Sequence, residues 1–251
     1  MRIKIFIDKS IYENAAYYYE LAKETRAKID GVQKAIEETK KAIASAENIR
    51  KTKKVRIKRK KEWYEAFHFF FTSGGKLAIG GRDQKQNEIV FRKHMEDNDL
   101  FFHADIQGGS AVVLKDGTNA TEQEKKEVAQ FAASFSNAWK NANAAVDVYA
   151  VKKDQVSQHA HGGYVAAGAF AIIGQREWFR NTPLGLKIGK EGNRVFVLPL
   201  LHSKKLENEI ALFPSKNGKE KEELAKQISY KLEADIDDIR GFLPSGKTLV
   251  K

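Results

Sequence analysis

The chain has 251 residues, 42% of them hydrophobic and 31% charged, with a formal net charge of +11. This length and composition allow one or two compact domains and exclude a wholly disordered chain. The absence of cysteine excludes disulfides, thiolate metal sites and a cysteine nucleophile. No apolar run approaches the ~18 residues that span a membrane, and residues 3–7 are too short for a signal peptide. We therefore expect a cytoplasmic protein with no membrane partner.

The N-terminal quarter predicts one long helix. Residues 3–8 alternate weakly and predict a short strand within residues 1–10, after which Ser10 and Glu13 have the spacing of a capping box. Residues 11–61 contain no proline, and apolar side chains recur every seven residues, at Ala15, Ala22, Ile29, Ile36 and Ile43. This narrow seam is typical of a coiled coil, and about fifty residues give a rod of roughly 75 Å. The seam needs a second helix, from another polypeptide or from a second copy of this chain.

The end of this helix carries most of the net charge. Residues 50–61 hold nine basic side chains and no acidic one, while the rest of the chain has 35 basic and 33 acidic residues. The nine are Arg50, Lys51, Lys53, Lys54, Arg56, Lys58, Arg59, Lys60 and Lys61. Such a run favours a polyanionic partner, with nucleic acid ahead of an anionic membrane. The alternative is a solvated helix face, but unbalanced like charges destabilise an isolated helix.

From Trp63 onward the pattern predicts an α+β domain, a mixed β-sheet with packed helices. The apolar runs predict strands at 76–80, 100–105, 110–114, 145–151, 164–173, 184–188 and 194–200. Helical spacing predicts helices at 84–95, 121–141 and 219–233, the second opened by a Thr121–Glu124 capping box. Residues 187–194 predict a hairpin, and the polar segment 203–222 predicts a surface loop. The aromatic residues of 63–71 are core candidates, with one or two rings available for base stacking.

A glycine turn, Gly80-Gly81-Arg82-Asp83, separates the first predicted strand from a helix. Asp83 stands three residues before Gln86, which predicts that its carboxylate caps the helix. Arg82 has no such local role, so its guanidinium is free to reach a phosphate or stack on a base.

Two histidine pairs suggest an alternative function. His103-x-Asp105 and His159-x-His161 together offer the ligand types of a zinc or manganese site, as in a metal-dependent hydrolase or nuclease. The simpler interpretation is that these side chains hydrogen-bond neighbouring loops. The sequence has no HExxH motif, nucleophile elbow, P-loop or dinucleotide fingerprint, so we expect no metal, no cofactor and no enzyme activity.

The segment WYEAFHFFFTSGGKLAIGGRDQKQNEIVFRKHMEDNDLFFHADIQGG resembles the NFACT-R domain of the NEMF and RqcH family of ribosome quality-control factors. The resemblance lies in its W-Y-E-x-F opening, in the G-G-R-D turn followed by Asn87 and Glu88, and in the H-A-D strand end. It continues through GGYVAAGAFAIIGQREWF, and the closing residues are similar to the C-terminal extension of archaeal members. It implies an NFACT-R-like RNA-binding domain at 62–181 and an extension at 182–251 packed on it.

The resemblance also implies a binding role and not catalysis. It implies tRNA or rRNA as partner, together with the large ribosomal subunit carrying a stalled nascent chain. The NFACT-N half of such factors has no counterpart in this sequence, so a separate NFACT-N-like chain is a candidate for the coiled-coil partner, beside a homodimer. We expect the basic run, Arg82, Asn87 and His103 to face RNA. We expect a structural role for the remaining motif residues, Gly80, Gly81, Asp83, Asp105 and Gly108.

Overall fold

The computed structural model describes residues 3–52, 61–157, 159–160, 163–164 and 170–251, with the backbone alone for 41–52, 159–160 and 163–164. The chain divides into two compact units, residues 1–60 and residues 61–251. Each unit is described by itself.

The first unit consists of the helix α1 (Ile11–Thr52) and a short segment before it. The predicted capping box is confirmed, since Ser10 N donates to Glu13 Oε2 at 2.7 Å and Glu13 N donates to Ser10 Oγ at 3.3 Å. The predicted strand at 3–8 is wrong. The buried Asn14 amide instead accepts from Phe6 N and donates to Phe6 O, and this pair of bonds holds the segment as a loop against the first turn.

The apolar seam of α1 is exposed over the part of the helix whose side chains are described, residues 11–40. Ile29, Val32 and Ile36 are 52%, 59% and 48% exposed. A lone solvated helix gains nothing from a seam of this kind, because its stability in water comes mainly from packing an apolar face. The exposure agrees with the expectation that a second helix covers the seam.

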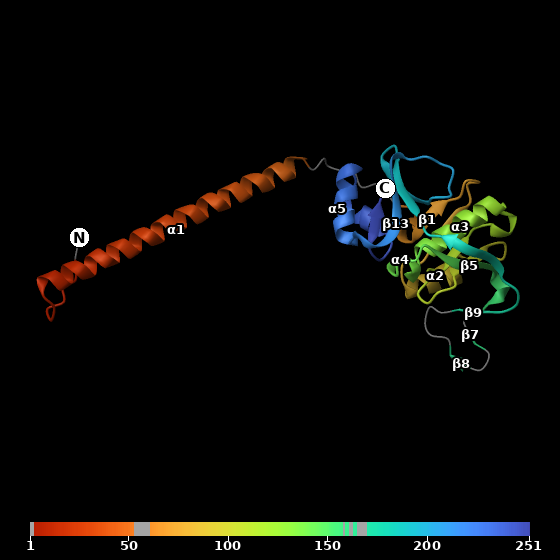
Figure 1. Ribbon diagram of the computed structural model, residues 1–251, viewed down its shortest axis with the longest axis horizontal. Coiled ribbons are helices and arrows are strands. Elements are labelled where there is room, and N and C mark those ends of the chain that lie inside the picture. The colour runs from red at the N-terminus through yellow and green to blue at the C-terminus, as the bar shows by residue number, and fades with distance from the viewer. Residues whose placement is uncertain (1–2, 53–60, 158, 161–162, 165–169) are drawn as a thin grey trace. The chain divides into compact units, whose positions relative to one another are not determined.

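The second unit is built on a six-stranded sheet (Figure 1). Its strand order is β1-β2-β4-β3-β5-β10, and every described pairing is antiparallel. The α+β class is therefore confirmed, but the sheet is not mixed. Its strands are β1 (His68–Phe71), β2 (Leu77–Gly80), β3 (Leu100–Ala104), β4 (Val112–Leu114), β5 (Ala145–Lys152) and β10 (Glu177–Pro183).

Alternation along the strands divides the side chains between two cores, because successive residues of a strand point to opposite faces. Phe102 and Phe70 enter a core with helix α3 (Glu122–Ser134), whereas Phe101 and Phe69 enter a smaller core with helix α2 (Gln84–His94). Both faces of the sheet are therefore partly covered, and the aromatic residues between 67 and 70 are buried as predicted. Trp63 and Phe71 are exceptions, being 49% and 39% exposed, and Trp63 stacks on His94.

The predicted helix at 121–141 is two helices. The Thr121–Glu124 capping box is confirmed at the start of α3, but α3 ends at Ser134 and α4 (Asn137–Lys140) begins after Ser136. The Ser136 side chain accepts from Ala138 N and caps the second helix, and Asn137 N donates to Gly108 O. Apolar spacing alone did not reveal this break, because Phe131, Phe135 and Trp139 keep a helical period across it.

A second sheet has the order β12-β11-β13-β14. Its strands are β11 (Leu186–Glu191), β12 (Arg194–Pro199), β13 (Glu207–Lys219) and β14 (Thr248–Val250). The predicted hairpin is confirmed, with Glu191 opposite Arg194 and Gly192 in the left-handed region at φ 58°. The predicted loop at 203–222 is wrong, because β13 occupies most of it and pairs with both β11 and β14.

The remaining elements are short. They are the 3-10 turns η1 (Trp63–Ala66), η2 (Gly117–Asn119) and η3 (Lys153–Gln155) and the strands β6 (Val156–Ser157), β7 (His159–Ala160), β8 (Gly163–Tyr164) and β9 (Ala171–Ile172). The predicted strand at 164–173 contributes only its ends, to β8 and β9, and its centre lies outside the described residues.

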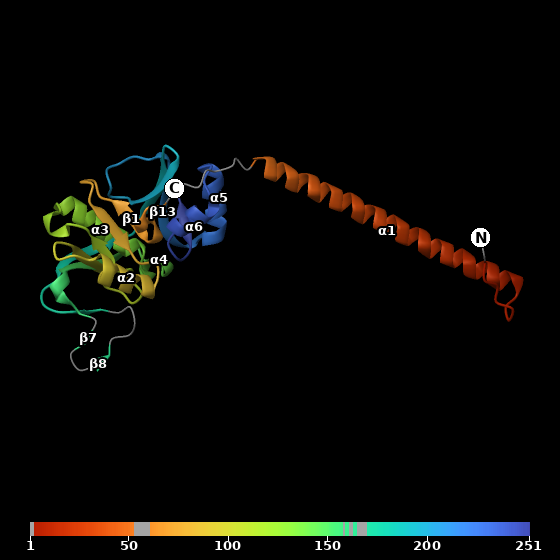
Figure 2. The ribbon, with the colours of Figure 1, turned by 180° about the vertical axis from the view of Figure 1, so that it is seen from behind.

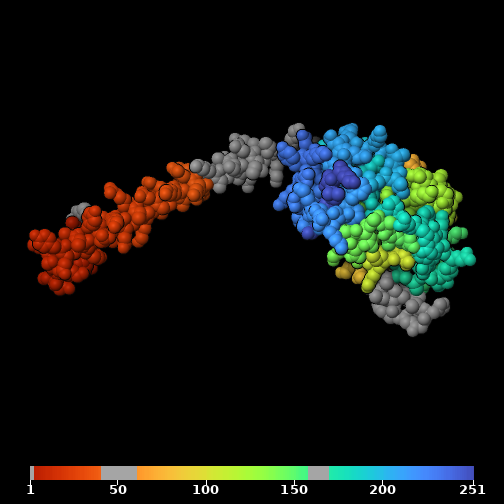
Figure 3. Space-filling model, in the orientation of Figure 1, coloured from red at the N-terminus to blue at the C-terminus, as the bar shows by residue number. Residues whose placement is uncertain are grey.

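The C-terminal residues complete the domain. Helices α5 (Lys221–Lys231) and α6 (Ile236–Phe242) lie side by side beside the second sheet (Figure 2). Leu224, Ile228 and Ile239 belong to the same buried core as Phe131 and Phe102. The sequence predicts a domain boundary at residue 181, and strand β10 runs across that position. Within residues 61–251, the blue C-terminal segment and the green segments share a continuous surface (Figure 3). No helix in the described part of the chain is long and apolar enough to span a membrane.

Candidate nucleic-acid interface

The glycine turn between β2 and α2 is fixed by its own side chains. Asp83 caps α2 as predicted, with Gln86 N donating to Asp83 Oδ1 at 2.8 Å, while Gln86 Oε1 accepts from Arg82 N at 3.1 Å. A Cβ on Gly81 would lie 2.2 Å from Asn87 Oδ1, and one on Gly80 would lie 2.9 Å from Ser110 Oγ. The structural role expected for these residues follows from this close approach.

Asn87 does not offer its amide to RNA. The residue is 7% exposed; its Oδ1 accepts from Ala111 N at 3.1 Å and its Nδ2 donates to Gly109 O at 3.5 Å. Both ends of the side chain therefore join α2 to the loop before β4. Asn87 was expected to face RNA, but its side chain instead has a structural role within the domain.

Arg82 keeps an accessible guanidinium. Its Nη2 donates to Glu65 O at 3.3 Å and to Phe67 O at 3.1 Å, and the residue is exposed. Partial burial lowers the pKa of Arg82 from its ordinary value, although the group stays charged at neutral pH. Two carbonyl contacts orient the side chain but do not neutralise it, so an anion remains its natural partner.

The His103–Asp105 segment ends β3 at a tight corner. His103 is half-buried and lies against the backbone of Gly109. Burial lowers the pKa of His103, with hydrogen bonds at Ala104 and Gly109 acting in the opposite direction. Asp105 N donates to Asp147 O at 2.8 Å, and Gly108 turns the chain at φ 80°. The imidazole is thus neutral at pH 7 and lies on the sheet.

His103 begins a row of rings that crosses three strands. It lies opposite Tyr149 of β5, and Tyr149 lies opposite Trp178 of β10. The ring centroids are 5.9 Å apart for His103 and Tyr149 and 5.6 Å apart for Tyr149 and Trp178. Directly opposed residues share one face of a sheet, so these three rings form a platform, which we call the aromatic row.

Two arginines lie over the end of the aromatic row. The Arg176 guanidinium carbon is 4.8 Å from the Tyr149 ring centroid, and that of Arg180 is 3.8 Å from the Trp178 centroid. Asp147 holds Arg180 in place, with Oδ2 2.5 Å from Nη1. Both arginines are exposed and Trp178 is half-exposed, whereas Tyr149 is only 8% exposed, so the part of the row that solvent reaches is its Trp178 end with the two cations. Rings and guanidinium planes are the groups on which unpaired bases stack.

Tyr149, Trp178, Arg176 and Arg180 are not among the site residues predicted from the sequence. A signal was present in Arg176-x-Trp178-x-Arg180, because residues two apart on a strand share a face. The pairing of Trp178 with Tyr149 depends on which strands are neighbours, and no local pattern contains that information.

The basic run lies largely beyond the described side chains. Residues 53–60 lie outside the described residues, and Arg50 and Lys51 are described by backbone alone. Lys61 is exposed, with its Nζ 2.9 Å from Asp238 Oδ1. The expected RNA contact of this run therefore stays a prediction.

The metal alternative gains no support. His161 lies outside the described residues and the His159 side chain is not described. Among the described side chains, no group of three or more His, Cys, Asp or Glu residues is arranged to hold a metal ion.

Comparison with known proteins matches residues 66–174 to the NFACT protein RNA binding domain. The chain is 43% identical over 138 residues to the archaeal Rqc2 homolog aRqcH of Methanocaldococcus jannaschii, covering 54% of this chain and 20% of that protein. It is 34% identical over 189 residues to the ribosome quality control complex subunit NEMF homolog of Drosophila melanogaster, covering 70% and 18%. The C-terminal structure of the fibronectin/fibrinogen-binding protein from Streptococcus suis aligns with a TM-score of 0.41 at 22% identity, over 68% of this chain and 76% of that one. The chain thus spans about a fifth of the length of the curated relatives it matches.

Proposed function

We propose that this chain is an RNA-binding component of ribosome-associated quality control, because residues 66–174 match the NFACT protein RNA binding domain. In this role it engages tRNA or rRNA on the large ribosomal subunit that carries a stalled nascent chain. Its similarity to an archaeal Rqc2 homolog and to a ribosome quality control complex subunit NEMF homolog supports this setting. The role is one of binding, in the cytoplasm, without a catalytic step or a cofactor.

The observation that carries the RNA-binding part is the aromatic row with its two guanidinium groups. Trp178 is half-exposed on an edge strand, and Arg176 has no ion pair with any described residue. An unpaired base that replaces Arg176 over the half-exposed Trp178 ring gains stacking, and the displaced guanidinium remains close enough to contact a phosphate. This arrangement suits single-stranded segments of RNA, whose bases are free to stack.

A matched pair of tryptophan variants tests this role. We expect Trp178→Ala to weaken tRNA binding by roughly 5- to 100-fold, since each stacked base contributes about 1–3 kcal/mol. Trp63→Ala is the control, because Trp63 is also half-exposed but stacks on His94 away from the row. Affinity is measured by fluorescence anisotropy at one fixed salt concentration. Equal affinities for the two variants would remove the aromatic row from the RNA interface.

The ribosomal part of the proposal has its own test. We expect the chain to co-sediment more strongly with large subunits that carry peptidyl-tRNA than with vacant large subunits. Equal recovery on both would reduce the proposal to general RNA binding. Stoichiometric zinc or manganese in the purified protein, with RNA cleavage lost in His103→Ala, would instead favour a nuclease.

A further inference from the structure

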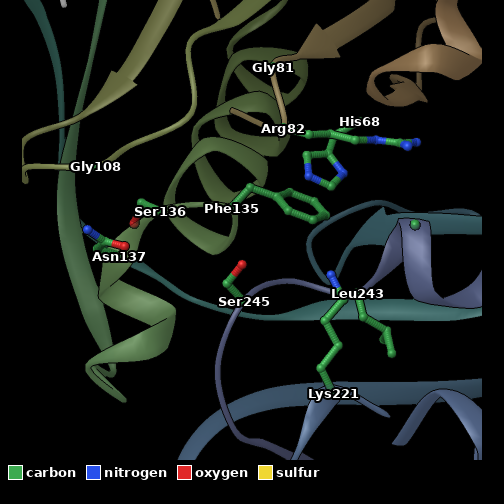
Figure 4. Close-up of a pocket in the computed structure, with 11 residues that line it drawn as sticks. His68, Gly81, Arg82, Gly108, Phe135, Ser136, Asn137, Lys221, Leu243 and Ser245 are labelled. Atoms are coloured by element: carbon green, nitrogen blue, oxygen red, sulfur yellow. The ribbon is translucent and has the colours of Figure 1, made fainter. Parts of the chain in front are cut away.

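A second feature of the domain is a cavity of about 240 Å³ on the side of the glycine turn (Figure 4). It is lined by residues of the family domain, among them His68, Arg82 and Phe135, and by Lys221 and Ser245 of the C-terminal segment. A liquid water occupies about 30 Å³, so the cavity admits a group several times that size. It is separate from the aromatic row, and no residue lines both.

Two cations from distant parts of the chain meet at this cavity. Arg82 follows β2, and Lys221 is the first residue of α5, with its ammonium pointing toward the side where Arg82 and His68 lie (Figure 4). Neither Arg82 nor Lys221 has an ion pair with a described carboxylate. The two acids next to Lys221 in sequence pair with other cations. Glu220 Oε1 lies 3.6 Å from Lys247 Nζ, and Glu222 accepts from Arg240 Nε and Nη2 at 2.8 and 2.9 Å. The cavity therefore has uncompensated positive charge.

The backbone adds to this charge. Glu220 stands at the N-cap of α5 but its side chain makes no capping hydrogen bond. The first N–H groups of an uncapped helix, together with its dipole, favour a negative group near its start. The two first-turn carboxylates, Glu222 and Glu223, are paired with Arg240 and Lys219. Burial, followed by the charge of Arg82, lowers the pKa of Lys221, and the neighbouring Glu222 carboxylate acts in the opposite direction.

His68 supplies an independent sign of a missing partner. Its imidazole is stacked on Phe135, with ring centroids 3.9 Å apart, and its Nδ1 is buried without a hydrogen-bond partner among the described residues. Buried polar atoms in folded proteins are nearly always hydrogen-bonded, so the orphaned nitrogen of this cavity-lining residue is an unsatisfied group close to the two cations. The neutral ring, in the tautomer with hydrogen on Nδ1, donates to an oxygen placed there.

We propose that this cavity binds one phosphoryl group, held by Arg82, Lys221 and His68. A phosphate combines compact negative charge, one unit in a phosphodiester and up to two in inorganic phosphate, with several acceptor oxygens, which suits two cations and one neutral donor. The group comes either from the backbone of bound RNA or from free inorganic phosphate. The assignment of the group to bound RNA rests on the proposed function, whereas the binding of a phosphate in the cavity does not.

Inorganic phosphate is the probe that tests the site on the full chain. It is titrated at constant ionic strength against chloride, and the ring nitrogen resonances of His68 are followed by NMR. We expect a saturable shift in the wild-type protein and at least a tenfold higher half-saturation concentration in Lys221→Met. Lys226→Met, an exposed lysine on the same helix, should behave as wild type. The absence of a saturable shift, or an equal half-saturation in Lys221→Met, would overturn the proposal.

The source of the phosphoryl group, RNA backbone or free phosphate, is identified by measuring the tRNA affinity of the same variants. A loss of both phosphate and tRNA affinity in Lys221→Met, with Lys226→Met unchanged, supports an RNA backbone phosphate. A loss of phosphate affinity with unchanged tRNA affinity supports free phosphate. If phosphate saturates the wild-type protein but tRNA does not bind it, the cavity site stands and the proposed function fails.

Discussion

At the scale of single residues, the domain places several side chains where local spacing alone does not explain them. The Asp83 cap was predictable, because an N-cap needs only a carboxylate three residues before a helical N–H. The role of Asn87 was not, since its two amide partners lie more than twenty residues away, at Gly109 and Ala111. Both Asp83 and Asn87 belong to the sequence motif, but membership of the motif does not say whether a residue supports the fold or faces a partner.

His68 makes stability depend on pH in a defined direction. Burial, followed by the charges of Arg82 and Lys221, holds the pKa of His68 well below its ordinary value of 6.5. The unfolded chain therefore takes up a proton near pH 6.5 while the folded one does not, so stability is intact above that pH and falls below it. We expect a loss of about 1 kcal/mol per pH unit below 6 from this group.

The check is the thermal midpoint at pH 7.5 and 5.5 in phosphate-free buffer, for the wild-type protein and His68→Phe. The difference between the two pH values should be smaller in the variant, whose ring still stacks on Phe135 but does not titrate. His94 and His103, whose pKa values burial also lowers, account for the pH dependence that remains. An unchanged difference in the variant would show that His68 is protonated as easily in the folded state as in the unfolded one.

Gly81 has a purely steric role that substitution should expose. A Cβ at this position meets Asn87 N at 2.5 Å and Asn87 Oδ1 at 2.2 Å, and backbone is unable to move aside cheaply. We expect Gly81→Ala to destabilise the domain by about 3 kcal/mol, or roughly 5–10 °C in thermal midpoint. Gly31→Ala is the control, because a Cβ there meets no atom within 4 Å and alanine favours the helix. A thermal midpoint for Gly81→Ala equal to that of the control would contradict the steric account.

At the scale of elements, strands and helices with an internal period were predictable, and those defined by distant partners were not. β3, β5 and β12 follow their apolar runs, whereas β13 is polar along much of its length and exists because β11 and β14 pair with it. The break between α3 and α4 likewise depends on a hydrogen bond from Asn137 N to Gly108 O. Pairing of this kind is set by the tertiary fold and leaves little trace in local composition.

The open seam of α1 leads to a prediction about assembly. If a second copy covers it, the wild-type chain should exceed its monomer mass in sedimentation equilibrium at tens of micromolar, and Ile29→Asp with Ile36→Asp should make it monomeric. A buried apolar pair contributes about 1.5–3 kcal/mol per side chain, so two charged substitutions are enough to separate the helices. A monomeric wild-type chain that gains helicity only with an NFACT-N-like chain would assign the seam to that partner. A monomer with a fully helical, partner-independent α1 would contradict the coiled-coil account.

At the scale of the whole molecule, charge is divided between two kinds of surface. Residues 50–61 hold nine of the 44 basic side chains without a single acid, which suits attraction to phosphates regardless of sequence. The aromatic row carries only two arginines but offers rings, which suits contact with bases. We expect the first surface to set the salt dependence of RNA binding and the second to set its preference for unpaired bases.

The most direct test of RNA binding is the affinity of the full chain for tRNA as a function of salt concentration. Each phosphate that a basic side chain neutralises contributes about 0.7–0.9 to the slope of log affinity against log salt, so engagement of six to nine charges predicts a slope of about −4 to −8. Reversing Lys53, Lys54, Lys58 and Lys60 to glutamate should lower the affinity and reduce that slope by about 3 or more. A binding constant that does not change with salt, or an affinity unchanged by the four reversals, would contradict the account.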